Sequence, residues 1–199
     1  MIEIPTDLPA ELVPLAWLRG VWEGTGVIDY EAEGHHYSTQ FTHRVSFSTG
    51  DGPYLNYSAD AWIGDGDDRV PLLAEIGFWR LARTQTEADP GPALLPARTA
   101  STPLTADDVE KLRGDDGAFP LEVALVRADG ISELLLGEVR GPRIDLASDA
   151  VVRPATAKPY TAASRMYGLV EGHLLWAWDV AALGAPMASH ASARLAKVE

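Results

Sequence analysis

The chain has no cysteine among its 199 residues. This absence excludes disulfide bonds, thiolate metal sites and cysteine nucleophiles. Basic residues are scarce too, since 16 Lys and Arg stand against 29 Asp and Glu and leave a formal net charge of -13. Nucleic-acid binding depends on neutralising phosphates with cations, and so acidic a chain is a poor match for it. The sequence therefore predicts no nucleic-acid partner.

Long apolar runs are also missing. No segment has the roughly 20 consecutive apolar residues that a membrane-spanning helix needs. The N-terminal stretch carries Glu3, Asp7 and Glu11 and lacks the basic region of a secretory signal. We therefore expect a cytoplasmic protein that does not associate with membranes.

What the chain does contain is a repeated β pattern. Short segments rich in β-branched and aromatic residues alternate with clusters of Gly, Pro and Asp. Junctions such as "RADGIS" and "LVEGHL" place one or two turn residues between strands, as hairpins do. About ten strands joined by tight turns predict an all-β, antiparallel up-and-down β-barrel. The predicted strands are Val21–Glu31, Gln40–Phe47, Pro53–Ile63, Val70–Ala82, Leu121–Arg127, Ile131–Arg140, Arg143–Ser148, Lys158–Val170, His173–Leu183 and Pro186–Lys197.

Two segments interrupt this pattern. Residues Leu8–Leu18 carry a weak apolar stripe, which predicts a short N-terminal helix that plugs one end of the barrel. The stretch Thr84–Pro120 is rich in Pro, Gly, Thr and Asp and is long for an unstructured connection. Within it, Thr105 and Asp108 have capping-box spacing and predict one short helix. This stretch is either a solvated insertion on a hairpin or a lid over the barrel mouth.

Barrel closure assigns a structural role to the C-terminal segment "GAPMASHASARLAKVE". The last strand has to pair with the first, because an open sheet would leave unpaired edges. Strict alternation along that strand places His190 on the same face as Ser192 and Arg194. The small neighbours of His190 leave room for a broad, flat ligand beside the imidazole.

Three other groups of residues have ordinary structural interpretations. His35 and His36 are adjacent, so on a strand they point to opposite faces and are badly placed to share one zinc ion. The acidic stretch "GDGDD" lacks the glutamate of a calcium loop and predicts a hydrated turn. Trp176 and Trp178 share a strand face and are expected in the barrel core or along a cavity.

Two motifs point to a family. The first is "GVWEGTG", in which Gly20, Trp22, Gly24 and Gly26 fit the pattern GxWxGxG. Gly24 and Gly26 fall on one strand face, where the missing Cβ permits close approach by a ligand or another segment. The second is the C-terminal third, which runs from "TAK" through "SRMYG" to "GAPMASHASARL". Both are similar to the nitrobindin family of bacterial proteins.

The resemblance covers nearly the whole chain except Thr84–Pro120. It implies a barrel of the fatty-acid-binding-protein or lipocalin kind. It further implies a single domain over residues 1–199 with an insertion at about 84–120.

Nitrobindins hold a b-type heme in the barrel mouth, so the resemblance implies one heme b per chain. By position, His190 matches the axial iron ligand, and Lys158 of the "TAK" motif matches a residue near the heme. Both side chains suit these roles, because neutral imidazole binds heme iron and an ammonium group pairs with a propionate. The implied activity is isomerisation of peroxynitrite to nitrate at ferric iron, together with binding of nitric oxide.

The chain departs from the family in one place. Members with well-formed heme sites carry a "PTI"-like stretch after the first strand, whereas this chain reads "DYEAEGHHYSTQF" there. Ser38 and Thr39 are the hydroxyl groups of this stretch that we consider for a contact with the distal ligand.

A second function remains open from the residues alone. The barrel would then carry a fatty acid or another small apolar molecule without catalysis. In that case Lys158 or Arg165 would face the ligand carboxylate, and His190 would be a polar group in the cavity. The sequence also leaves both a monomer and a homodimer open.

Overall fold

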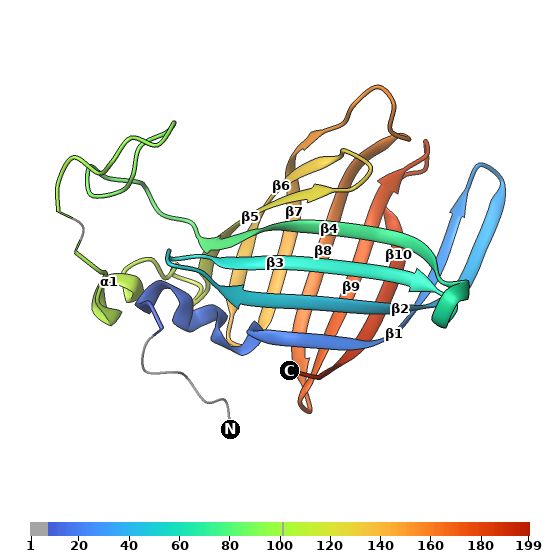
Figure 1. Cartoon of the computed structure of the whole chain (residues 1–199), viewed down its shortest axis with the longest axis horizontal. Helices are drawn as coiled ribbons and strands as arrows, with labels where there is room; N and C mark the ends of the chain where they lie inside the picture. Colours follow the sequence, from blue (N-terminus) through green and yellow to red (C-terminus); the bar gives the residue numbers. More distant parts are fainter. Residues whose placement is uncertain (1–7, 101) are drawn as a thin grey trace.

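The computed structural model describes residues 8–100 and 102–199. Ten antiparallel strands form one closed barrel in which β10 lies between β1 and β9 (Figure 1). Every other pair joins strands that are consecutive in the chain, which confirms the predicted up-and-down barrel. The strands are β1 (Gly20–Ala32), β2 (His35–Thr49), β3 (Leu55–Ile63), β4 (Val70–Leu81), β5 (Phe119–Arg127), β6 (Ser132–Arg140), β7 (Arg143–Val152), β8 (Tyr160–Val170), β9 (His173–Ala182) and β10 (Ala188–Lys197).

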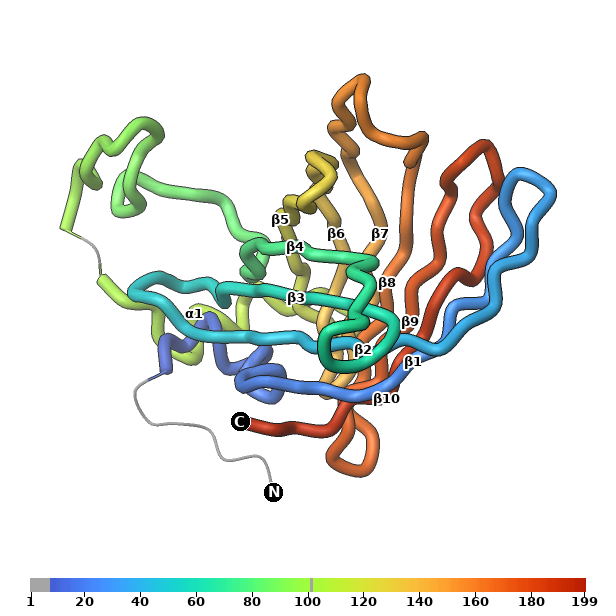
Figure 2. Tube along the Cα trace, turned by 45° about the vertical axis from the view of Figure 1, so that its right-hand side comes forward, coloured from blue at the N-terminus to red at the C-terminus, as the bar shows by residue number. Residues whose placement is uncertain are grey.

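The first hairpin is longer than predicted. β2 begins at His35 rather than Gln40, because the pairing of β1 with β2 continues to Ala32 and His35. Glu33 and Gly34 form the connecting turn, with φ values of 52° and 77°. The stretch after the first strand is therefore a two-stranded projection rather than a loop (Figure 2).

Two other predicted segments need adjustment or description. β8 begins at Tyr160, so Lys158 lies in the loop before the strand and not within it. The "GDGDD" stretch forms the exposed turn between β3 and β4, which includes the short 3-10 helix η2 (Gly66–Asp68).

The acidic residues Glu3 and Asp7 of the N-terminal segment lie outside the described residues. In the described part, no helix is long and apolar enough to cross a membrane.

The predicted N-terminal plug is present as a 3-10 helix, η1 (Ala10–Leu18). Pro14 inside it has no N–H to donate, which weakens α-helical hydrogen bonding. Leu12, Leu15 and Leu18 are fully buried in the core at this end of the barrel. The Trp22 indole donates to the Leu18 carbonyl oxygen at 2.6 Å and ties the plug to β1.

The long stretch after β4 lies at the plug end of the barrel. Its helix α1 (Ala106–Glu110) begins with the predicted capping box, formed by Thr105 and Asp108. Val109 is buried on the side of α1 that contacts η1. Figures 1 and 2 show the described parts of this stretch at the end of the barrel opposite the β1–β2 and β9–β10 turns. The interpretation as a lid over the mouth is therefore wrong, because β4 ends and β5 begins at the opposite end.

The glycines of "GVWEGTG" let β10 lie close to β1. A Cβ atom on Gly24 would be 2.2 Å from the Arg194 carbonyl oxygen. One on Gly26 would be 2.4 Å from the Ser192 carbonyl oxygen and 2.6 Å from Phe41 Cζ. Real Cβ atoms do not approach so closely, so the glycines serve chain packing at the seam where the barrel closes.

Replacing Gly26 with Val should destabilise the closed barrel. The added side chain collides with β10 backbone and with Phe41, and overpacking of this kind costs about 1–3 kcal/mol. Urea unfolding would measure the loss in free energy of unfolding. Thr25→Val, on the exposed face of the same strand, serves as the control and should change stability little. Equal stability of both variants would contradict the close-packing role of Gly26.

Candidate functional site

His190 is the extra residue of a β-bulge in β10. Along β9, Ser189 and Ala191 take consecutive partners, and His190 between them has none. A bulge of this kind re-aims the side chain that it carries. The imidazole packs against the rings of Tyr30 and Trp178, with ring centroids 4.4 and 5.4 Å away. Both of these rings are buried on the inner face of the barrel, so His190 lies against the interior.

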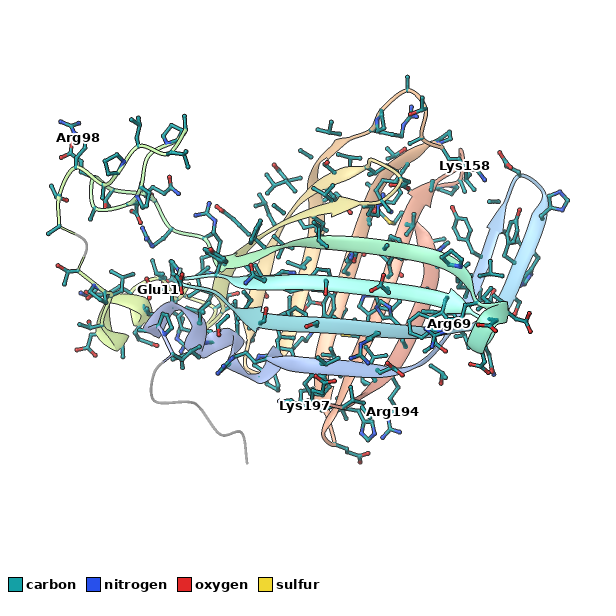
Figure 3. All side chains as sticks on the ribbon, viewed as in Figure 1. Glu11, Arg69, Arg98, Lys158, Arg194 and Lys197 are labelled. Carbon is teal, nitrogen blue, oxygen red and sulfur yellow. The ribbon has the colours of Figure 1, made fainter. Side chains whose placement is uncertain are left out.

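The prediction that His190 shares a strand face with Ser192 and Arg194 is therefore wrong. Ser192 and Arg194 are exposed on the outer face of β10, as Figure 3 shows for Arg194. Ala193 and Leu195 are buried on the inner face. The bulge breaks strict alternation between Ser189 and Ala191, and alternation alone does not reveal it.

The barrel wall opens beside His190. Pairing of β1 with β10 runs only as far as Ile28 and Ala191, beyond which β1 pairs with β2 alone. A cleft of about 540 Å³ lies between the β1–β2 hairpin tip and the β9–β10 turn. The Tyr30 hydroxyl spans from the hairpin to the end of β9 and donates to the Ala182 carbonyl oxygen at 3.0 Å. The β1–β10 pairing thus ends next to His190, and the cleft lies beyond that point, between the two turns.

The His190 imidazole has the protonation state of a metal ligand. The side chain is half-buried, and burial lowers its pKa from the usual value near 6.5. It is therefore neutral at pH 7, and a neutral ring has a lone pair available. Its Nδ1 atom is buried and has no hydrogen-bond partner among the described residues. This environment fits coordination of heme iron.

The other two sequence-predicted regions lie at the same end of the barrel. Lys158 is exposed in the β7–β8 loop at the mouth, where Figure 3 labels it. Thr39 is half-buried on the inward row of β2 that also contains Phe41 and His43. Ser38 is exposed on the outward row, so of the two hydroxyls Thr39 is the one that faces the interior.

Below the mouth, a belt of buried charges crosses the barrel. Arg165 from β8 donates to both carboxylate oxygens of Glu75 from β4, at 2.6 and 3.0 Å. The same guanidinium lies 3.6 Å from Glu133 of β6. Burial raises the pKa of Glu75, but the charge and hydrogen bonds of Arg165 outweigh burial and lower it. Glu75 is therefore ionised, and the belt is held by charge pairing.

Sequence reasoning missed Glu75 and Glu133 as parts of the site. The available signal was a glutamate on the inward-facing period of an otherwise apolar strand, in "EIGFWRL" and "SELLLGEV". The carrier hypothesis uses Arg165 only as a partner for a ligand carboxylate. In the structure it is already committed to Glu75 and Glu133.

Beneath the belt, large side chains fill the barrel. Phe47, Trp79 and Tyr167 are at most 2% exposed and pack edge to face, with centroid separations of 5.1–6.5 Å. This packing and the committed Arg165 remove the acyl-chain site that the carrier hypothesis needs.

His43 contributes a second buried imidazole under the mouth. It is fully buried, stacks on Trp176 with centroids 4.7 Å apart, and pairs through Nδ1 with the Asp60 carbonyl oxygen at 3.0 Å. Burial lowers its pKa from the usual value near 6.5. His43 is thus a neutral residue of the core at pH 7.

The family model described as "THAP4-like, heme-binding beta-barrel domain" matches residues 11–197. The chain belongs to this heme-binding β-barrel family. Membership confirms the family resemblance noted from the sequence and establishes heme as the cofactor.

Relatives of this heme-binding barrel match over the full chain. Proteins named peroxynitrite isomerase from Leifsonia xyli subsp. xyli and Clavibacter michiganensis subsp. michiganensis are 59% and 56% identical, each with 100% of both chains covered. Rv2717c from M. tuberculosis, a solved structure, has a TM-score of 0.68 at 23% identity. That match covers 97% of this chain and 100% of the other. The structural likeness supports the barrel fold.

Acidification should destabilise the protein through His43. Because its pKa is lowered in the folded state, the unfolded state takes up a proton first as pH falls below about 6.5. Stability is then lost toward the folded pKa, with a slope of up to about 1.4 kcal/mol per pH unit for one such group. Urea unfolding between pH 7.5 and 5 would measure the slope. His43→Gln should flatten it, and an unchanged slope would contradict this assignment.

Proposed function

We propose that the chain is a heme-dependent peroxynitrite isomerase that binds one heme b. In this proposal His190 is the axial iron ligand, and Lys158 pairs with a heme propionate. The observation that carries it is the bulge at His190, which turns a neutral imidazole into the barrel next to the point where the β1–β10 pairing ends. The names of the full-length relatives support the choice of substrate.

Bound ferric heme would supply a Lewis-acidic iron, the chemistry needed to rearrange peroxynitrite to nitrate and to bind nitric oxide. The chain itself has simpler tasks. The isomerisation moves no net proton, so no side chain has to act as a general base. His190 holds the cofactor. Thr39 offers a hydroxyl group on the inward row of β2, whereas its neighbour Ser38 is on the exposed row.

The packed interior keeps the reaction at the mouth. The ion pair between Arg165 and Glu75 is buried, with both residues at most 3% exposed, and Phe47, Trp79 and Tyr167 pack closely below it. A ligand held beside His190 therefore lies above this packed layer.

We further propose that residues 1–199 form one barrel domain and that the protein is cytoplasmic. The insertion at about 84–120 then has a purpose other than access to the heme. Support for this division comes from the position of the insertion at the plug end, away from His190.

Hemin titration of the purified apo-protein tests the ligand assignment. Wild type should give a Soret shift that saturates at one heme per chain, and His190→Ala should lose it. His173→Ala, a histidine at the opposite end of the barrel, is the matched control. Lys158→Ala should weaken binding only about two- to fivefold, because an exposed ion pair contributes less than about 1 kcal/mol. An identical Soret band in His190→Ala would contradict the assignment.

Stopped-flow decay of peroxynitrite tests the activity. The heme-loaded protein should speed formation of nitrate, and heme-loaded His173→Ala should match it. Coordinated heme without any acceleration would contradict isomerase function while preserving heme binding.

We also propose that the chain forms a homodimer through the outer face of β4, β5 and β6. Ile76 and Phe78 are 63% and 54% exposed there, and Val126, Leu134 and Leu136 extend the patch. An exposed apolar patch of this kind marks an interaction surface. Two copies with a net charge of -13 repel each other least where the surface is uncharged.

Phe78→Asp should convert this dimer to a monomer, because it places a carboxylate at the centre of the apolar patch. Size-exclusion chromatography with light scattering would measure the mass. Ser192→Asp, on the exposed face of β10 across the barrel, is the control and should stay dimeric. A monomeric wild type would contradict the proposal.

A further inference from the structure

Arg127 is a buried cation whose side chain has no hydrogen-bonded carboxylate in the part of the chain that the structure describes. It ends β5 at the mouth of the barrel and is 8% exposed. Its Nε and Nη2 atoms are buried and have no hydrogen-bond partner among the described residues. Burying guanidinium N–H groups without a hydrogen-bonding partner is costly, and Nε and Nη2 are in this condition.

The carboxylates of the belt are already engaged elsewhere. Glu75 accepts from Arg165 and Tyr57. Glu133 accepts from Tyr160 and Ser148. In the described part of the chain, ion-pair distance to Arg127 is reached only by Asp129, 4.0 Å from Nε, and that side chain is 55% exposed.

Aromatic rings hold the guanidinium in place beside the heme ligand. Arg127 Cζ lies 3.9 Å from the ring centroid of Tyr160 and 5.8 Å from that of Trp178. Trp178 also contacts His190, and its own indole N–H is buried with no hydrogen-bond partner in residues 8–100 and 102–199. Tyr160 follows the loop that carries Lys158. Arg127 is thus held in place by rings of which one, Trp178, also contacts His190.

The chemistry of the free groups defines the ligand. Guanidinium and indole nitrogens only donate hydrogen bonds, so the missing partner is an acceptor. The forked geometry of a guanidinium matches a planar group with two oxygens, which it binds in a bidentate manner.

We propose that Arg127 forms an anion site at the barrel mouth for a planar group with two acceptor oxygens. Two sources offer this chemistry, a free oxyanion such as nitrate and a carboxylate of the bound heme. The heme source rests on the proposed function, whereas the free oxyanion does not. Different probes separate the two.

The first experiment uses apo-protein and sodium nitrate, exchanged for sodium chloride at constant ionic strength. Nitrate at tenfold its Kd should raise Tm by about 3–6 °C in wild type. Arg127→Met should abolish this shift and be at least as stable as wild type in chloride, because it removes an unpaired buried charge. Arg69→Gln is the control, since Arg69 also stacks on an aromatic ring, 4.3 Å from Trp62, but is exposed.

The second experiment compares hemin with hemin dimethyl ester, which has no free carboxylate. If a propionate is the partner, Arg127→Met should weaken hemin binding about ten- to hundredfold and leave ester binding unchanged. His190→Ala should lose the Soret band of coordinated heme and keep any nitrate shift, which separates failure of the heme assignment from failure of this site.

Loss of either response in Arg127→Met, with Arg69→Gln behaving as wild type, supports the anion site and identifies its source. Equal nitrate shifts and equal hemin and ester affinities in wild type and Arg127→Met overturn it.

Discussion

Closure of the barrel by β10 is the constraint on which the site depends. β10 pairs with β1 on one side and β9 on the other, and Gly24 and Gly26 allow its backbone to lie close to β1. This pairing holds His190 in place although it lies near the end of the chain. The pairing of β10 with β1 stops at Ala191, directly next to His190.

The second organising feature is the buried belt of Glu75, Glu133 and Arg165, together with the buried Arg127 at the mouth. The two arginines and two glutamates have formal charges that cancel. Both carboxylates, however, lie at ion-pair distance from Arg165, and neither lies at that distance from Arg127. The belt divides the barrel into a packed lower part and a polar mouth. Burial under the mouth also keeps His43 and His190 neutral.

Much of the architecture follows from local pattern. Alternation and turn residues predicted ten strands and their order, and the Thr105–Asp108 spacing predicted α1. These features are short-range, since each depends on residues a few positions apart. The motif "GVWEGTG" and the C-terminal motifs likewise predicted the family from the sequence alone.

Only the tertiary structure decided which way His190 points and which cations are free. A bulge depends on how β10 meets β9, and strict alternation therefore assigned His190 to the wrong face. Arg127 and Arg165 look equivalent in sequence, yet carboxylates from β4 and β6 reach only Arg165. Such pairings join residues far apart in the chain, so the sequence determined the barrel and the candidate ligand, and closure of the barrel determined their geometry.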